Sequence, residues 1–116
     1  MTVTDSVISG NDSLGLQVFA TGNVALVRSV VSRNLNTGVS VSGVATLDSS
    51  IVRGNTSYGL YVDTSAKVYM SNMTVDSNAG AGVGNSGTVY TRQNNTVEGN
   101  AVNYSGTGAL NNITAF

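Results

Sequence analysis

Six carboxylates carry whatever acid–base or metal chemistry this chain can do, because its 116 residues include no histidine and no cysteine. That composition excludes thiolate and histidine catalysis, disulfides and zinc–sulfur sites. Among the six, Asp76 and Glu98 occupy equivalent places, each two residues before an asparagine of a repeated pattern. Two carboxylates one repeat apart can work as an acid–base pair or bind a hard cation.

The neighbours of these carboxylates favour a structural role instead. Arg53 holds the same place one repeat earlier, so Arg53, Asp76 and Glu98 form a surface column with one attractive and one repulsive contact. Asp5 and Arg28 also share a place, and we expect this ion pair to carry little energetic weight. A glycosidase needs its carboxylates in a cleft, and no long insertion between the repeats builds one. We therefore predict no catalytic residue, no metal site and no cofactor.

The repeat is marked by five asparagines, separated by 23, 21, 23 and 22 residues: Asn11, Asn34, Asn55, Asn78 and Asn100. An aliphatic residue stands three places before each of them, and a glycine follows each of the first four by four places. The segment after Asn100 loses the second half of this pattern. Self-similarity at a fixed period indicates a repeat architecture.

Apolar and polar residues alternate within each repeat, as they do over residues 15–18 and 59–62. Alternation with period two predicts short strands with one buried face, about three in each repeat. Such a unit buries its apolar face only against its neighbours in a stack. The sequence therefore predicts one all-β domain over residues 1–116, a parallel β-helix (solenoid) of about five coils with 21–23 residues per coil.

The two most regular columns have a structural interpretation. Each asparagine is expected at a tight turn, where its amide group hydrogen-bonds to the coils above and below and tolerates a left-handed backbone. Each glycine is expected where a side chain would cost strain or space.

The unit Leu-x-x-Ser-x-Val-x-x-Asn-x-x-x-Gly-Leu-x-Val stands at residues 47–62, at 26–41 with Val39 in place of the second leucine, and more loosely at 3–18. It resembles the repeat of right-handed parallel β-helix proteins, the pectin-lyase-like superfamily, and residues 90–100 resemble the closing coil of many bacterial members. Because enzymes of that superfamily usually have many more coils, the resemblance implies the C-terminal coils of such a protein, or a minimal member. It also implies an extracellular or cell-surface location. It is specific for architecture and poorly specific for function, since such repeats serve lyases, hydrolases, epimerases and adhesins.

One column of branched side chains is a candidate association surface. Val7, Val30 and Ile51 stand four residues before successive asparagines, and alternation points them away from the core. Neighbouring aliphatic side chains of this kind form an exposed apolar patch, which often marks an interface. No capping helix is predicted before Val3, so we also expect a partner chain to shield the first coil. A homo-oligomer is the expected assembly.

Three tyrosines are candidate carbohydrate-binding residues. Tyr61 lies between two apolar strand residues and is expected to point outward, and Tyr69 and Tyr90 occupy matching places in neighbouring coils. Stacked exposed tyrosines can hold a sugar ring, or they can simply cover the sheet as cross-strand neighbours. A polysaccharide is therefore the second expected partner.

Charge and hydropathy exclude other function classes. Charged residues make up 9% of the chain and the formal net charge is −1, so there is no basic nucleic-acid footprint. No apolar run approaches the roughly 20 residues that a membrane span needs. The opening Met-Thr-Val-Thr-Asp lacks the basic and apolar parts of a signal peptide, so none is expected there. The Thr2 and Thr4 pair does not recur in later coils, which argues against an ice-binding face.

The sequence thus predicts a non-catalytic β-solenoid module with a structural or association role, with glycan contact as a further expectation. The alternative is a fragment or minimal relative of a polysaccharide lyase or hydrolase. Release of unsaturated or reducing sugar from a polysaccharide would favour the alternative, whereas saturable binding without turnover would favour the module.

Overall fold

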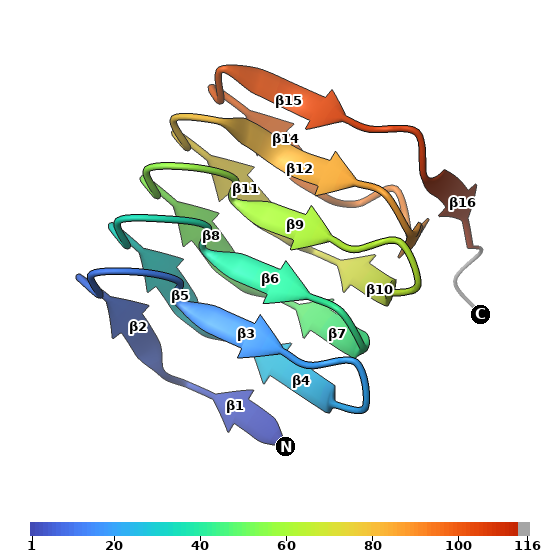
Figure 1. The fold of residues 1–116 in the computed structure, drawn as a ribbon, viewed down its shortest axis with the longest axis horizontal. Helices are drawn as coiled ribbons and strands as arrows, with labels where there is room; N and C mark the ends of the chain where they lie inside the picture. The colour runs from blue at the N-terminus through green and yellow to red at the C-terminus, as the bar shows by residue number, and fades with distance from the viewer. Residues whose placement is uncertain (114–116) are drawn as a thin grey trace.

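A computed structural model describes residues 1–113 as a parallel β-solenoid of about five coils (Figure 1). Each coil gives one strand to each of three parallel sheets, and no residue among 1–113 is helical. Sheet A contains β1 (Thr2–Thr4), β4 (Asn23–Val27), β7 (Val44–Asp48), β10 (Lys67–Ser71), β13 (Thr88–Thr91) and β16 (Ala109–Asn112). Sheet B contains β2 (Val7–Ser9), β5 (Val30–Ser32), β8 (Ile51–Arg53), β11 (Thr74–Asp76) and β14 (Thr96–Glu98). Sheet C contains β3 (Leu16–Val18), β6 (Val39–Val41), β9 (Leu60–Val62), β12 (Ala81–Asn85) and β15 (Val102–Ser105).

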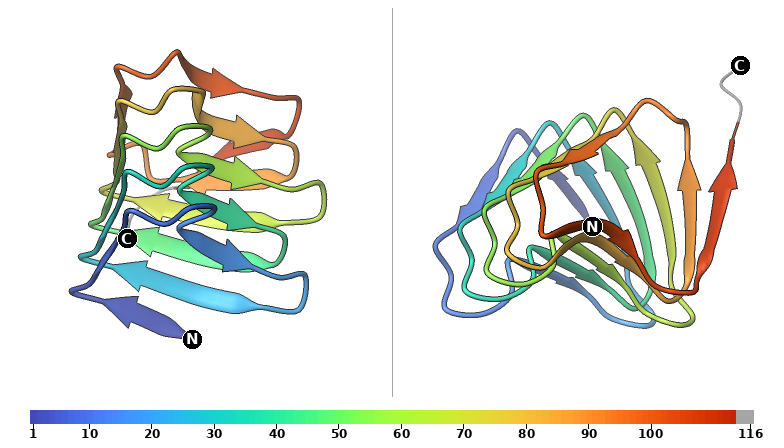
Figure 2. Two further views of the ribbon diagram at one scale, coloured as in Figure 1. Left: turned by 60° about the vertical axis from the view of Figure 1, so that its left-hand side comes forward. Right: turned by 90° about the horizontal axis from the view of Figure 1, so that it is seen from above.

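The register of the sheets follows the columns of the sequence repeat. Val31, for example, pairs with Ile8 on one side and with Val52 on the other. Each strand therefore lies beside the equivalent strand of the next coil, as the two views of Figure 2 show. This confirms the predicted all-β, parallel, stacked architecture.

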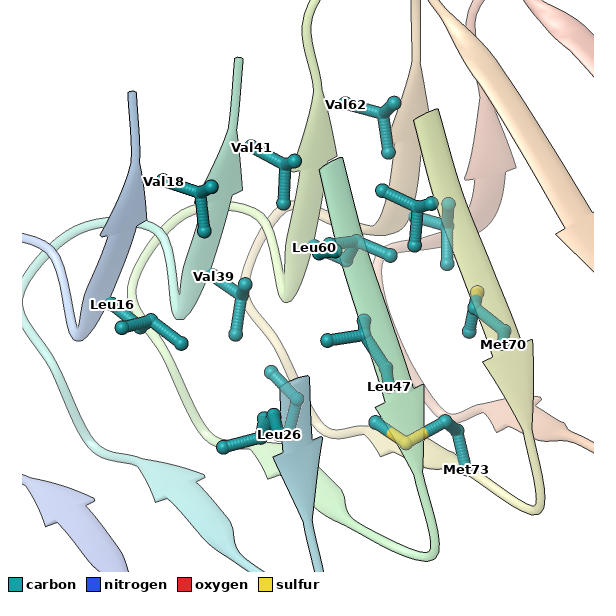
Figure 3. Packing of buried hydrophobic residues seen from close by; sticks show 14 of the residues in the cluster. Leu16, Val18, Leu26, Val39, Val41, Leu47, Leu60, Val62, Met70 and Met73 are labelled. Atoms are coloured by element: carbon teal, nitrogen blue, oxygen red, sulfur yellow. The ribbon is translucent and has the colours of Figure 1, made fainter. Parts of the chain in front are cut away.

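The core is a set of aliphatic columns that run along the solenoid (Figure 3). Leu26 and Leu47 are aligned neighbours in sheet A, and Val39 and Leu60 are aligned neighbours in sheet C; all four are at most 1% exposed. Burying a valine or leucine side chain contributes about 1.5–3 kcal/mol. Because the same columns recur from coil to coil, each coil provides apolar surface against which the side chains of the next coil are buried.

The five asparagines form a continuous ladder of hydrogen bonds. Asn34 donates from its backbone N and from its Nδ2 to the Oδ1 of Asn55, at 3.1 and 3.0 Å. Asn55 donates in the same way to Asn78, at 3.0 Å from each nitrogen. The rungs from Asn11 to Asn34 and from Asn78 to Asn100 repeat this pattern. Asn34, Asn55 and Asn78 are at most 2% exposed, so these bonds satisfy buried polar groups that would otherwise destabilise the fold.

The left-handed backbone lies one residue earlier than we expected. At the turn that holds the ladder, the positive φ angles fall on the residue before each ladder asparagine, on glycines in three coils and on Arg33 (53°) and Ser77 (57°) in the other two. A second column of positive φ lies at another turn: Asp5, Arg28, Ser49, Asn72 and Gln93. The asparagines are therefore kept for their amide groups and not for tolerance of an unusual φ.

The glycine column is explained by lack of space and not by backbone strain. A Cβ at Gly59 would lie 2.6 Å from Nδ2 of Asn78 and 2.7 Å from Cγ1 of Val75. A Cβ at Gly38 would approach Asn55 and Val52 in the same way. The chain thus passes so close to the ladder that only glycine fits.

The fifth coil has a strand in sheet C, although the sequence pattern is lost after Asn100. Strand β15 pairs with β12, and Tyr104 takes the place that Val83 holds one coil earlier. Aligned residues of these coils are 21 apart at Met70 and Thr91, 22 apart at Val75 and Val97, and again 21 apart at Tyr104. The fifth coil therefore has one extra residue between β13 and β14 and one fewer between β14 and β15 than the fourth coil has at the same places. Counting a fixed number of residues from Asn100 therefore misses the match between β12 and β15.

The ladder predicts a large difference between an interior rung and the first rung. Asn55→Ala removes the acceptor of two donors on Asn34, and we expect it to lower the free energy of unfolding by about 3 kcal/mol. Asn11→Ala is the matched control, because Asn11 is exposed, and we expect a loss of about 1 kcal/mol. Urea denaturation measures both, and equal losses would contradict a ladder whose strength comes from buried rungs.

Candidate functional site

An aromatic pair stands on the outer face of sheet A. In β10 the side chains of Val68 and Met70 are buried, so the intervening Tyr69 points outward. The register places Tyr69 beside Tyr90 of β13. Their ring centroids are 4.7 Å apart and their planes differ by 11°, so the rings are stacked, and Tyr69 remains 37% exposed.

A surface hollow of ≈ 310 Å³ adjoins Tyr69. Among residues 1–113, its lining includes the hydroxyl-bearing residues Thr46 and Ser71, the exposed Arg92 and the apolar Ile113, and no carboxylate. Thr46 is aligned with Tyr69 one coil earlier, whereas Arg92 and Ile113 follow β13 and β16 on the other side of β10, so the hollow extends along the ends of several strands of sheet A. An aromatic face, two hydroxyl groups and a guanidinium therefore meet on one rigid sheet.

Tyr61 lies on a different face from the other two tyrosines. It belongs to β9 in sheet C, where the flanking Leu60 and Val62 are buried. Its ring packs against Tyr58, with centroids 5.3 Å apart and a tilt of 45°, next to Gly84. The structure therefore brings Tyr69 and Tyr90 together and leaves Tyr61 out of that site.

The branched column Val7, Val30 and Ile51 runs along the outside of sheet B in successive coils. Val7 is 70% exposed, whereas Val30 and Ile51 are half-buried. A shallow hollow of ≈ 400 Å³ on this face is lined by Val30, Arg33 and Arg53, among others. Apolar exposure in the column is thus concentrated in the first coil.

Two of the six side-chain carboxylates, Asp5 and Asp76, form ion pairs between coils. Asp76 lies between Arg53 and Glu98 in the register of sheet B, and Arg53 donates to both of its carboxylate oxygens, at 2.9 and 2.8 Å. The Asp76 carboxylate raises the pKa of Arg53. Arg28 likewise donates to both oxygens of Asp5, and these hydrogen bonds hold the pKa of the Asp5 carboxyl below its usual value.

Asn85, near the end of the solenoid, has a role that sequence reasoning missed. Asn85 interrupts a valine column, yet it is fully buried and donates from Nδ2 to the Tyr104 hydroxyl and the Ala109 carbonyl oxygen. Its Oδ1 accepts from the backbone N of Gly87. The break in the column was the available signal. Asn85 thus joins β12 to β15 and β16 at the point where the apolar column ends.

The interior is open above the last coil. A hollow of ≈ 190 Å³ is lined there by apolar side chains that include Met70, Val83, Val89 and Tyr104.

Within residues 1–113, no helix is long and apolar enough to cross a membrane. The same residues contain no group of three or more carboxylates that could hold a metal ion together.

Comparison with known proteins gives one finding. A family model described as a right-handed β-helix region matches residues 1–102. No curated protein and no solved structure matches the chain.

The Asp5–Arg28 pair predicts a measurable shift of one carboxyl titration. A group whose folded pKa is depressed adds stability above its unfolded pKa and loses it as the pH falls through the folded pKa. We expect carbon-detected NMR to show that the pKa of Asp5 lies below the ordinary aspartate value of 3.8, and that Arg28→Gln moves this pKa back toward that value. Arg53→Gln is the control and should leave Asp5 unchanged. An Asp5 pKa that does not respond to Arg28→Gln would rule out this cause.

Proposed function

Because this chain belongs to the right-handed β-helix family, we propose that it is a non-catalytic β-solenoid module that contacts a polysaccharide through Tyr69 and Tyr90 and associates with copies of itself. The observation that carries the glycan contact is the stacked pair beside the hollow lined by Thr46, Ser71 and Arg92. Small-molecule sites combine an apolar or aromatic surface with a few placed polar groups, and this arrangement has both.

Two features of the pair suit a sugar ring. Stacking on Tyr90 fixes the orientation of Tyr69, so little side-chain freedom is lost when a ligand binds. The Tyr69 ring also adjoins the hollow, where the hydroxyl groups and the guanidinium can hydrogen-bond to sugar hydroxyl or carboxylate groups. A polymer can run along the sheet, because the outer face of a solenoid continues from coil to coil.

Binding without turnover is supported by where the carboxylates lie. No carboxylate of residues 1–113 lines the hollow beside Tyr69. Asp76 and Glu98, which share a column, lie in sheet B, and Asp76 is engaged by Arg53. Hydrolysis of a glycoside by the usual route needs two carboxyl groups flanking the scissile bond.

The glycan contact predicts a selective effect of Tyr69→Thr. Threonine fits this place, since Thr46 holds it one coil earlier. We expect calorimetric titration with an oligoglucan or an oligo-uronate to show saturable binding, and Tyr69→Thr to weaken it about tenfold, the equivalent of about 1.4 kcal/mol.

Tyr61→Thr is the control and should leave the affinity unchanged. Lack of binding to both saccharides, or equal effects of the two substitutions, would contradict the proposal. Release of reducing or unsaturated sugar would favour the lyase or hydrolase alternative.

Self-association is supported by the exposure of Val7, which is 70% although it lies on a strand of a parallel sheet. We expect equilibrium sedimentation to show species heavier than the monomer at high micromolar concentration. Val7→Lys should shift the population toward monomer, because a charge on an edge strand opposes association. Only monomer in the unmodified protein would contradict this part of the proposal.

A further inference from the structure

Both ends of the stack leave strand edges and apolar side chains uncovered within the described residues. At one end, β14 and β15 each have a paired neighbour on one side only. Val102 is 53% exposed and Tyr104 38% exposed there. At the other end, β2 and β3 also have a single neighbour, and Val7 is exposed. Unpaired edges of this kind are templates for pairing with another chain.

The asparagine ladder makes the two ends complementary. Every rung donates from one coil to the Oδ1 of the next, so the ladder has a direction. At its last rung, Asn100 donates from its backbone N and its Nδ2 to the Oδ1 of the nearby Asn103, at 3.3 Å from each nitrogen, longer than the bonds of the interior rungs. Its Nδ2 also donates to the carbonyl oxygens of Val75 and Glu98, at 3.0 and 3.1 Å. At its first rung, the Oδ1 of Asn11 accepts no hydrogen bond from residues 1–113. At one end, therefore, Asn103 Oδ1 holds the place of the next rung through two long bonds that an incoming acceptor can replace, and at the other end the matching acceptor, Asn11 Oδ1, has no donor among residues 1–113.

We propose that a second copy of this chain stacks head to tail on the fifth coil, so that the Asn11 Oδ1 of the incoming copy accepts from Asn100. This assembly rests on the self-association proposed above and specifies its surfaces. Strands β2 and β3 of the incoming copy extend sheets B and C beyond β14 and β15. The copies stay parallel, and the ladder continues across the junction.

The register across this junction matches apolar with apolar residues. Val97 ends the inward column that Ile8 begins, and Tyr104 ends the column that Leu16 begins. On the outside, Thr96 ends the column that Val7 begins, so the exposed Val7 side chain is covered by its new neighbour. Each copy contributes a coil of 21–23 residues, which agrees with the roughly 20–30 residues per partner of a standard interface.

Strand β16 decides how sheet A continues. It already fills the place above β13, which is the place that β1 of an incoming copy would take. β16 must therefore pair with β4 of the incoming copy, in place of that copy's own β1. Asn111 is aligned with Tyr90, in the column that also contains Ala25, so Asn111 then lies beside Ala25 of the other copy. The shared coil consists of β16 from one copy and β2 and β3 from the next.

Engineered cysteines test the junction cleanly, because the chain has none of its own. Residues aligned in neighbouring parallel strands lie about 4.8 Å apart, within the Cα separation that a disulfide spans. We expect a mixture of the Thr96→Cys and Val7→Cys variants of the full chain to form a mixed disulfide-linked dimer in a glutathione buffer. Thr46→Cys is the matched control: it is exposed but lies in an interior strand of sheet A, and it should not link to Thr96→Cys.

The possible outcomes separate the two levels of the proposal. Association in sedimentation without the mixed disulfide overturns head-to-tail stacking and leaves self-association in place, whereas monomer alone overturns both. Disulfides formed only between two Val7→Cys chains would show that the first coils meet each other, which also overturns the head-to-tail arrangement. A disulfide between Asn111→Cys and Ala25→Cys supports the exchange of β16 for β1, and its absence overturns that exchange.

Discussion

The fold depends on buried amide groups that hydrogen-bond from coil to coil. Parallel strands of three to five residues bury too little surface to hold a coil by itself, so each coil needs contacts that recur at the same place in its neighbours. The Asn34, Asn55 and Asn78 side chains provide such contacts inside the protein, where an unsatisfied donor would destabilise it. The glycines and valines beside them leave only the space that this ladder occupies.

The sequence predicted the features that depend on a regular period. The asparagine spacing indicated the coils, the apolar alternation indicated the buried faces, and matching places brought Tyr69 to Tyr90 and Arg53 to Asp76. All of these follow from parallel register, since residues in the same column of a repeat become neighbours.

The features that the sequence could not predict depend on the turns. Tyr61 lies in another sheet from Tyr69 because the chain turns a corner between β9 and β10, and a period does not say where corners fall. At the ladder turn, the residue before each ladder asparagine has the positive φ, and the repeat period does not show which residue of the turn takes that conformation. The role of Asn85 required knowledge of β16, which returns to the stack outside the repeat pattern.

The same repeat accounts for both proposed functions. A rigid sheet holds an aromatic pair in a fixed orientation, which suits a polymeric sugar better than a reaction that needs a closed cleft. A stack built from equal coils also has ends that resemble its own interior, which is why we propose another copy as its partner. Because such an interface is heterologous, repeated addition leads to an open assembly instead of a closed ring.

The central claim is that buried rungs of the asparagine ladder hold the coils together, and hydrogen exchange of the side-chain amides tests it most directly. The account predicts slow exchange for the Nδ2 hydrogens of Asn34, Asn55 and Asn78, and fast exchange for an exposed asparagine such as Asn36, whose Nδ2 lies outside the ladder. Equal, fast exchange at all four side chains would contradict it.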